Sequence, residues 1–459
     1  MYVERENEIN KLKSFYDDPE QKVAAVYGRY CMGKTTLLRH FSEGRKTVFF
    51  TAYSTTDKEE VRLFANALAK EDAESLEEVL DAVTALSEEG KTLLIMDHYP
   101  DFVKADASFE KILYTYVTEN WKDKDIKVIL CGDSYLHMEK YVLGKKSVWK
   151  SFPLFTMEVG PMDFRESRGF FDKLSSEEIL FLYGLTGGIP YHLNKVQGLS
   201  LDQAITETYL VSSKGGCLRP EDTMSIELRE NAYYNRMLST LAKGLLRVNQ
   251  MSQAVGKPKD VVVPYMNTLM GLGMVTKDTA ITEKTNRKKT RYSIVNTGDL
   301  FWYHFIADNM KLFYDNDVEG MLKVIHDKPE AYLQEVFIRL CKEYLITMGA
   351  EGKMPFTIDE IGNWWENDEE KGTSFGFDLV ALGHREDKDA TIYGRCYYGT
   401  DPIEIHQLKE LIDMTKKLKR DGDVFYMIFS KAGFHENAMT VSATIKNIML
   451  VTLDEVVKF

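Results

Sequence analysis

Short apolar runs separated by helical patterns fill the first third of the chain. The runs lie at residues 23–28, 47–53, 92–97, 127–133 and 155–160, and they are rich in Val, Ile, Leu and Phe. Between them, stretches such as 61–70 and 75–89 have the apolar spacing of amphipathic helices. Strands that alternate with helices indicate a parallel sheet covered on both faces. We therefore predict an α/β domain over residues 1–165.

The pattern changes after residue 165. Residues 175–240 are mainly helical, with a Gly-Gly-Ile-Pro break at 187–190 that ends one helix and begins another. Further helices lead to two β-like runs, 273–278 and 292–296, around a polar loop, which suggests a winged helix. Helical, aromatic-rich residues follow at 299–345. Residues 346–459 alternate strands with a helix near 405–419 and predict a second, smaller α/β unit.

Composition narrows the class of protein. The 459 residues suffice for about three domains, and 44% hydrophobic with 28% charged residues suits a globular chain. No apolar run reaches the ~18 residues that span a bilayer, and the charged start MYVERENEIN differs from a signal peptide. Five cysteines without a CxxC pair favour reduced thiols in the cytoplasm. The net charge of −13 argues against a surface that is basic overall, but not against a local basic patch.

Residues Gly28–Thr35 fit the phosphate-loop pattern GxxxxGK[ST], between a predicted strand and a predicted helix. In this motif the glycines let backbone N–H groups point inward, and the helix N-terminus adds partial positive charge. Lys34 is suited to bridge the β and γ phosphates, and the Thr35 hydroxyl to bind Mg²⁺. We therefore predict that ATP or ADP binds with Mg²⁺. The predicted nucleotide-binding residues are Gly28, Arg29, Tyr30, Cys31, Met32, Gly33, Lys34, Thr35 and Thr36.

Two later strand ends supply candidate partners for this loop. Asp97 ends the apolar run of LLIMDHYPDF and is the predicted carboxylate on the magnesium side, with His98 beside it. Asp133 or Ser134, after the next strand, would lie near the γ phosphate and orient water or sense the phosphate. A loop-start cap is an equally good interpretation of Asp133. For Cys31, a redox role and a small residue in a tolerant loop position both stay open.

The ordered set of motifs resembles the AAA-like, STAND-type P-loop ATPases of prokaryotes that carry a C-terminal DUF234 domain. The motifs are Val3–Glu8, the phosphate loop, LLIMDHYPDF, Cys131–Ser134, GLTGGIPYHL and Phe301–Phe305. The resemblance implies an ATPase core at 1–165, a helical lid at 166–225 and a winged helix at 226–298. It also implies a helical connector at 299–345 and a domain like the PD-(D/E)XK nucleases at 346–459. The lid segment with Pro190 is the part that resembles a nucleotide-responsive element in these ATPases.

The chain departs from this family at positions that carry catalysis. A glutamate usually follows the strand aspartate in the family, where this chain has His98. The family also tends to have an arginine after the fourth strand, where Lys150 offers a point charge without a guanidinium fork. An imidazole differs from a carboxylate in position and charge as an acceptor of the water proton. We expect tight ATP binding with slow or absent hydrolysis, and we assign His98 and Asp133 as the residues at the catalytic position.

The nuclease-like domain lacks most of the groups that this chemistry needs. Such a site uses about three acids and a lysine around Mg²⁺. Of the family's positions only Asp378 keeps its acid, while the others hold Ile338, Arg395 and Tyr397, with Glu335 one helical turn from Ile338. We expect Asp378 to pair at a strand end with Arg395, and the nuclease to be inactive. The aromatic residues Trp364, Trp365, Tyr393, Tyr397 and Tyr398 are predicted to be core or interface rather than a base-stacking platform.

A basic loop is the candidate contact with duplex DNA. It follows the predicted recognition helix, in which Pro264 would lie near the first turn, and its basic residues are Lys284, Arg287, Lys288, Lys289 and Arg291. A solvated hairpin tip is the alternative. The sequence as a whole predicts an ATP-binding regulatory switch outside the membrane, with its oligomeric state open. The alternative is a DNA- or protein-binding module with a largely structural ATPase domain.

Overall fold

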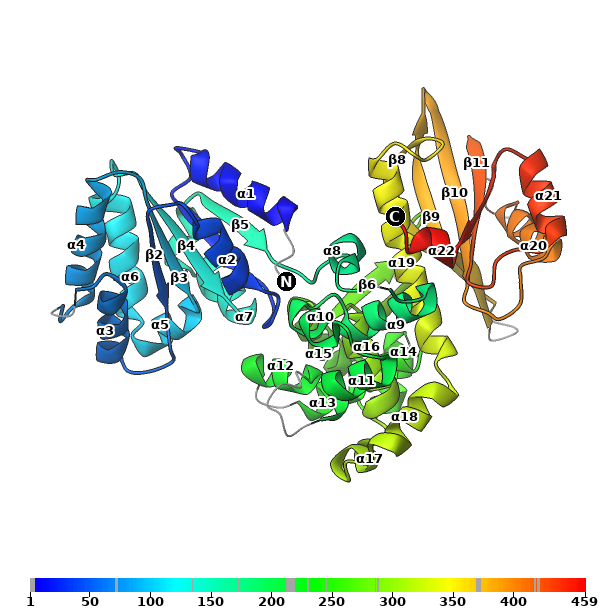
Figure 1. The fold of residues 1–459 in the computed structure, drawn as a ribbon, viewed down its shortest axis with the longest axis horizontal. Helices are drawn as coiled ribbons and strands as arrows, with labels where there is room; N and C mark the ends of the chain where they lie inside the picture. The colour runs from blue at the N-terminus through cyan, green and yellow to red at the C-terminus, as the bar shows by residue number, and fades with distance from the viewer. Residues whose placement is uncertain are drawn as a thin grey trace. The chain divides into compact units, whose positions relative to one another are not determined.

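The chain forms two compact units in its computed structural model (Figure 1). Unit 1 comprises Met1–Met162, Ile189–Tyr191 and Glu221–Arg229, and unit 2 comprises Asp163–Gly188, His192–Pro220 and Glu230–Phe459. The structure describes residues 5–70, 73–133, 135–171, 173–211, 219–228, 231–244, 246–284, 286, 289–368, 373–416, 418 and 422–459. Within these ranges no helix has both the length and the apolar character needed to cross a bilayer.

Unit 1 is built on a five-stranded parallel sheet, which confirms the predicted fold class. Its strands are β1 (Val23–Tyr27), β2 (Thr47–Thr51), β3 (Thr92–Asp97), β4 (Ile126–Gly132) and β5 (Leu154–Glu158). They lie in the order β2-β3-β4-β1-β5. The central strands β3 and β4 are buried along their whole length, which explains why their sequences are apolar runs without alternation.

Helices cover both faces of this sheet (Figure 1). They are α1 (Glu6–Asp17), α2 (Lys34–Ser42), α3 (Asp57–Ala67), α4 (Leu76–Ser87), α5 (Tyr99–Ala105), α6 (Ser108–Thr115), η1 (Tyr116–Asn120), α7 (Tyr135–His137), η2 (Met138–Leu143) and η3 (Val148–Ser151). Successive β1 side chains point to opposite faces, so Val23 packs with α3 to α6, and Ala24 packs with α1 and α2.

The strand register brings three chain segments to one edge of the sheet. Tyr27 at the end of β1 pairs with Gly132 at the end of β4, and Met96 near the end of β3 pairs with Leu130. The segments after β1, β3 and β4 therefore leave the sheet side by side. In open parallel sheets, ligands bind at this carboxyl edge.

Unit 2 begins with short helices and continues with a three-helix and hairpin segment. Its helices up to the C-terminal sheet are α8 (Phe164–Arg168), α9 (Ser176–Thr186), α10 (Pro190–Val196), α11 (Leu201–Ile205), η4 (Thr206–Leu210), α12 (Pro220–Glu227), α13 (Ala232–Ala242), α14 (Val248–Val255), α15 (Lys259–Gly271), α16 (Thr297–Phe301), η6 (Trp302–Ile306), α17 (Met310–Tyr314), α18 (Val318–Asp327) and α19 (Glu330–Ala350). The first residues of α10 and most of α12 belong to unit 1.

The segment predicted as a winged helix has the expected element order. Helices α13, α14 and α15 precede an antiparallel hairpin of β6 (Val275–Thr279) and β7 (Thr290–Ile294). The predicted place of Pro264 was wrong, because α15 begins at Lys259 and the proline lies inside it. Pro258 is the N-cap residue of α15 and has an extended backbone. The helix therefore begins at the next residue, Lys259.

A five-stranded mixed sheet forms the C-terminal part. Strands β8 (Thr357–Asp368), β9 (Thr373–Arg385) and β10 (Lys388–Tyr397) are antiparallel, and β11 (Asp423–Ser430) and β12 (Ile448–Thr452) continue parallel to β10. The remaining helices are α20 (Ile405–Thr415), α21 (Glu436–Thr444) and α22 (Leu453–Val456). Helix α19 packs on β8 and β10 and continues past residue 345, because its buried side reaches Met348. The prediction that Asp378 lies at a strand end was wrong. Strand β9 extends in both directions beyond this residue, from Thr373 to Arg385.

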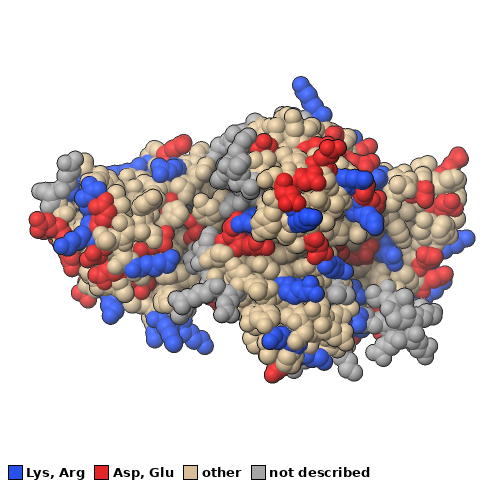
Figure 2. Space-filling view, turned by 90° about the horizontal axis from the view of Figure 1, so that it is seen from below, with Lys and Arg blue, Asp and Glu red and all other residues tan. Residues whose placement is uncertain are grey.

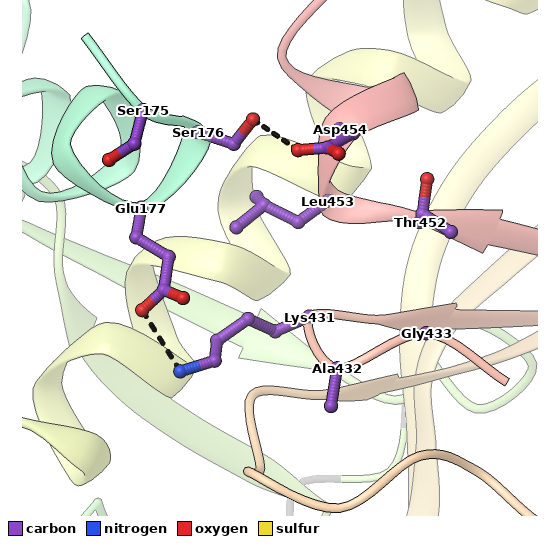
Figure 3. A pocket seen from close by; sticks show the side chains of 9 residues that line it. All are labelled: Ser175, Ser176, Glu177, Lys431, Ala432, Gly433, Thr452, Leu453 and Asp454. Atoms are coloured by element: carbon purple, nitrogen blue, oxygen red, sulfur yellow. Dashed lines mark hydrogen bonds and ion pairs between the residues drawn. The ribbon is translucent and has the colours of Figure 1, made fainter.

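Polar contacts tie the first helices of unit 2 to this sheet (Figure 3). Around a small cavity of about 360 Å³, the Ser176 hydroxyl donates to Asp454, and Lys431 Nζ lies 3.0 Å from Glu177 Oε2. On α19, Glu343 accepts from the Phe164 N–H at 2.8 Å and from the Tyr183 hydroxyl at 2.7 Å. Burial raises the pKa of this carboxyl. Helix α9 is thus held by hydrogen bonds to α19, to α22 and to Lys431, which follows β11.

The Gly-Gly break at 187–188 is fixed by one asparagine. Asn296 Nδ2 donates to the Gly187 carbonyl at 2.8 Å, and Asn296 Oδ1 accepts from the N–H groups of Gly298 and Asp299, which begin α16. Gly187 has a left-handed backbone with φ of 58°, and a Cβ there would lie 2.2 Å from Asn296 Oδ1. Only glycine fits this position without displacing the asparagine.

We predict that Asn296→Ala destabilises unit 2 by about 1–3 kcal/mol, because it removes a helix cap and leaves the buried Gly187 carbonyl unsatisfied. Urea denaturation of the full chain measures the change. Asn249, exposed within α14, provides the control, and Asn249→Ala should stay within about 0.5 kcal/mol. Equal stability of the two variants would contradict this account of the Gly-Gly break.

Candidate nucleotide site

The loop after β1 presents the start of α2 to the carboxyl edge of the sheet. Gly28 passes so close to the next segment that a Cβ there would lie 2.2 Å from the Val159 carbonyl oxygen. Gly33 takes a left-handed conformation with φ of 78° and caps α2 without any side-chain hydrogen bond. No acidic residue stands in the first turn of α2. This helix N-terminus is therefore suited to accept an anion.

Lys34 is the buried charge at the centre of this loop. Its side chain is only 3% exposed, and its Nζ donates to the carbonyl oxygens of Gly28 and Arg29, at 2.8 Å each. It also forms an ion pair with Asp133, which follows β4. Lys34 is thus held by its own loop and by one acid, in the position where phosphate oxygens would compete for the same ammonium group.

Thr35 and Asp97 form the second part of the site. The Thr35 hydroxyl donates to Asp97 Oδ2 at 2.7 Å, and Asp97 is almost completely buried at the end of β3. The thiol of Cys131 lies beside Asp97, and burial raises the pKa of this thiol well above its usual value. A hydroxyl next to a carboxylate is a pair of hard oxygen ligands, which fits Mg²⁺.

His98 turns toward Asp133 rather than away from the site. It has a left-handed backbone with φ of 55°, and its N–H donates to Asp97 Oδ1 at 3.2 Å. Its ring Nδ1 lies 3.2 Å from Asp133 Oδ2. Asp133 therefore bridges Lys34 and His98, a contact that neither predicted interpretation of Asp133 contained. Asp101, the next acid, pairs instead with Lys104 at 2.9 Å.

The other predicted residues lie at different depths around the loop. Met32 is buried in the apolar cluster beneath α2, whereas Tyr30 and Thr36 are exposed. Arg29 and Cys31 are partly buried, and Cys31 has a left-handed backbone with φ of 66°. Lys150 is exposed within η3, and Ser134 lies outside the described residues.

Pro190, expected in a nucleotide-responsive lid segment, lies at the phosphate loop. Its ring carbon Cγ would be 3.6 Å from a Cβ on Gly33, and the neighbouring Ile189 packs in the same apolar cluster as Met32. Sequence reasoning missed Ile189, although an isolated apolar residue between glycine and proline was the available signal. Arg5, part of the motif Val3–Glu8, is buried and donates to the Gly160 carbonyl at 2.8 Å.

Family comparisons agree with this geometry. Residues 2–196 match the model of an ATPase domain found predominantly in Archaea. Residues 302–401 match DUF234, a domain of archaeal and bacterial proteins of unknown function. The chain thus carries an ATPase domain of this predominantly archaeal family, followed by a DUF234 domain.

Two further proteins are similar to this ATPase. An uncharacterized protein of Methanocaldococcus jannaschii is 28% identical over 398 residues, which cover 84% of this chain and 86% of that protein. A Walker-type ATPase of Pyrococcus abyssi superposes with a TM-score of 0.50 at 16% identity, over 66% of this chain and 96% of that one. The second likeness shows a shared fold alone.

In the DUF234 domain, Asp378 of β9 interacts with Arg395 of β10. Asp378 Oδ2 accepts from the Cys396 N–H at 2.8 Å, and Arg395 Nε lies 3.5 Å away. Burial raises the pKa of Asp378. Among the described residues, no three His, Cys, Asp or Glu side chains are grouped for a metal ion. Trp364, Trp365 and Tyr393 are buried in the core of this domain, which confirms their predicted place.

The basic loop of the hairpin is partly neutralised by the chain itself. Lys284 pairs with Glu360 at 2.7 Å, and Lys289 pairs with Glu283 and, at 3.4 Å, with Glu366. Arg291 lies over the ring of Trp365 at 4.4 Å. Arg287 and Lys288 lie outside the described residues. On the face drawn in Figure 2, acidic and basic side chains of the described residues are interspersed.

We predict that Asp133→Asn destabilises unit 1 by about 1–3 kcal/mol without nucleotide, because buried Lys34 loses its carboxylate. Lys34→Met should cancel part of this loss in the double variant, and urea denaturation of the full chain measures both. Asp123 is an exposed acid in the same unit, and Asp123→Asn should have no such effect. Additive effects of Lys34→Met and Asp133→Asn would show that the two charges are not coupled.

Proposed function

We propose that this ATPase is a regulatory switch that binds ATP or ADP with Mg²⁺ and hydrolyses ATP slowly or not at all. The observation that carries the proposal is the engagement of His98 with Asp133, directly beside the predicted magnesium acid Asp97.

Binding rests on groups that already point at one place. The uncapped start of α2 offers backbone N–H groups, and Lys34 would exchange the carbonyls of Gly28 and Arg29 for phosphate oxygens. Thr35 and Asp97 would hold Mg²⁺, which when bound neutralises charge on the phosphates. Of the loop residues, buried Met32 would contribute only its backbone.

Slow hydrolysis is expected because the side chains that could accept a proton from water are engaged with one another. Hydrolysis needs a group that orients water and takes its proton. The Asp133 carboxylate interacts with both Lys34 and His98, so it is already neutralised. The Nδ1 of His98 faces this carboxylate, so this ring nitrogen is engaged with Asp133 and only Nε2 is left to act on a water molecule. Asp101, the next acid along the chain, pairs with Lys104.

Coupling between binding and the rest of the chain would pass along residues 187–191. Pro190 lies at Gly33 in unit 1, and Gly187 is hydrogen-bonded to Asn296 in unit 2. Three peptide bonds separate Gly187 from Pro190. A nucleotide that alters the position of Pro190 would therefore act on the anchored Gly187, as expected of a lid at 166–225 that responds to nucleotide.

The nuclease-like domain and the segment predicted as a winged helix are proposed to bind partners and not to cleave nucleic acid. The pairing of Asp378 with Arg395 removes the acid that a nuclease would use for Mg²⁺, so the nuclease-like domain at 346–459 would be inactive. The described cysteines at 31, 131, 341 and 396 form no disulfide, which supports the proposed cytoplasmic location. A winged helix at 226–298 that binds DNA is the alternative function. The ion pairs of Lys284 and Lys289 weigh against it.

We predict that the purified chain binds Mg-ATP with turnover at least about 100-fold below the ~10 per second of a typical enzyme. Lys34→Ala should weaken binding by at least about tenfold, because the ammonium contact to the phosphates is lost. Fluorescent-nucleotide titration and phosphate release measure the two quantities. Lys145, a lysine outside the loop, provides the control as Lys145→Ala. Fast hydrolysis that Lys34→Ala abolishes would defeat the proposal of a slow switch.

We also predict that His98→Glu raises the ATPase rate by about tenfold or more, because it restores a carboxylate at the position of the proton acceptor. His98→Gln, which removes the imidazole without adding a base, separates this effect from a loss of the contact with Asp133. Rates are compared at saturating Mg-ATP. If the glutamate variant binds ATP but turns over no faster than His98→Gln, the histidine is not what limits hydrolysis.

A further inference from the structure

A large cavity opens within unit 2, apart from the nucleotide loop. It has a volume of about 850 Å³, and its walls come from the β6–β7 hairpin, helix α19 and strands β8 and β9. Cavities of this size are typical of sites for small ligands. Asp378 and Arg395 of the nuclease-like domain lie in its wall, and the proposed switch gives the cavity no role in binding a ligand.

Arg291 is the unusual charge in this cavity. Its guanidinium lies over the ring of Trp365 at 4.4 Å and is partly buried. Within the described residues no carboxylate forms an ion pair with it, and the acid that acts on it through space is Glu335. Burial, together with the nearby charge of Arg247, lowers the pKa of Arg291 to about 10. The guanidinium is still charged at neutral pH, so its surroundings favour an added anion.

The other charged side chains leave the cavity with an excess of positive charge. Two of its four acids are matched within the cavity, Glu360 by Lys284 and Asp378 by Arg395. The two others are Asp278, which accepts from the Ser293 hydroxyl, and Glu335. Against these stand Arg291 and the further basic side chains Lys277, Arg339 and Lys342. Lys277 and Lys342 are exposed, so they are available to a ligand that enters from solvent.

We propose that this cavity binds a phosphate ester, with Arg291 as the central contact and Lys277 and Lys342 as further cations. A guanidinium group can bind two oxygens of a phosphate at once. Several cations in one cavity also suit a phosphate, which carries more negative charge than a single carboxylate. Trp364 and Trp365 are buried, and Lys289 and Arg291 each lie over one of the two rings. Bases therefore find no free stacking surface on these two rings, and the ligand is recognised by its phosphate without regard to base.

The test uses the full chain with Lys34→Ala throughout, so that the phosphate loop does not contribute and the result is independent of the proposed switch. Three probes separate the sources of the phosphate: inorganic phosphate, AMP, and a labelled single-stranded hexanucleotide without terminal phosphates. Binding is measured at low salt and again as salt is raised. Arg291→Gln should weaken the bound probe by about tenfold, and for the oligonucleotide it should reduce the salt slope by about 0.7.

Matched variants keep the result interpretable. Lys323, an exposed lysine on α18 outside the cavity, is the control, and Lys323→Gln should bind like its parent. If Arg291→Gln fails to fold, the double variant Lys277→Gln/Lys342→Gln on exposed positions decides in its place. Binding of phosphate or AMP that depends on these residues assigns a free phosphate ester, and binding of the hexanucleotide alone assigns a nucleic-acid strand. The proposal is overturned if no probe binds, or if the cavity variants bind as tightly as Lys323→Gln.

Discussion

The buried ammonium of Lys34 is the constraint around which the nucleotide site is arranged. A charge that is only 3% exposed must be compensated, and here two loop carbonyls and Asp133 do so. This requirement fixes the path of the loop after β1 and brings the segment after β4 against it. Asp133 then reaches His98, so the compensation of one lysine also determines the surroundings of the residue beside Asp97.

The same chemical arrangement recurs in the DUF234 domain. There Asp378 interacts with Arg395, as Asp133 interacts with Lys34. In both places a carboxylate is matched by a basic side chain of the chain itself. Removing one member of such a pair would leave the other charge without its partner, so each pair constrains the loops or strands that carry it.

Much of the fold was predictable from local pattern. The parallel sheet followed from apolar runs between helices, and the phosphate loop and Asp97 followed from motif spacing. The links between Lys34, Asp133 and His98 were not predictable, because they join loops that only the strand order brings together. The stacking of Arg291 on Trp365 was hidden for the same reason. Pro264 was misplaced because helix boundaries depend on neighbouring turns more than on periodicity.

The backbone of His98 explains why histidine and Asp133 belong together. A left-handed residue other than glycine costs about 1–2 kcal/mol, and here it aims the side chain at the Asp133 carboxylate. A glutamate in that conformation would bring a second negative charge close to Asp133, and the two carboxylates would repel each other across a partly buried site. An imidazole can donate to Asp133 instead. With histidine at this position, Asp133 contacts Lys34 and His98 and has no second carboxylate at residue 98 beside it.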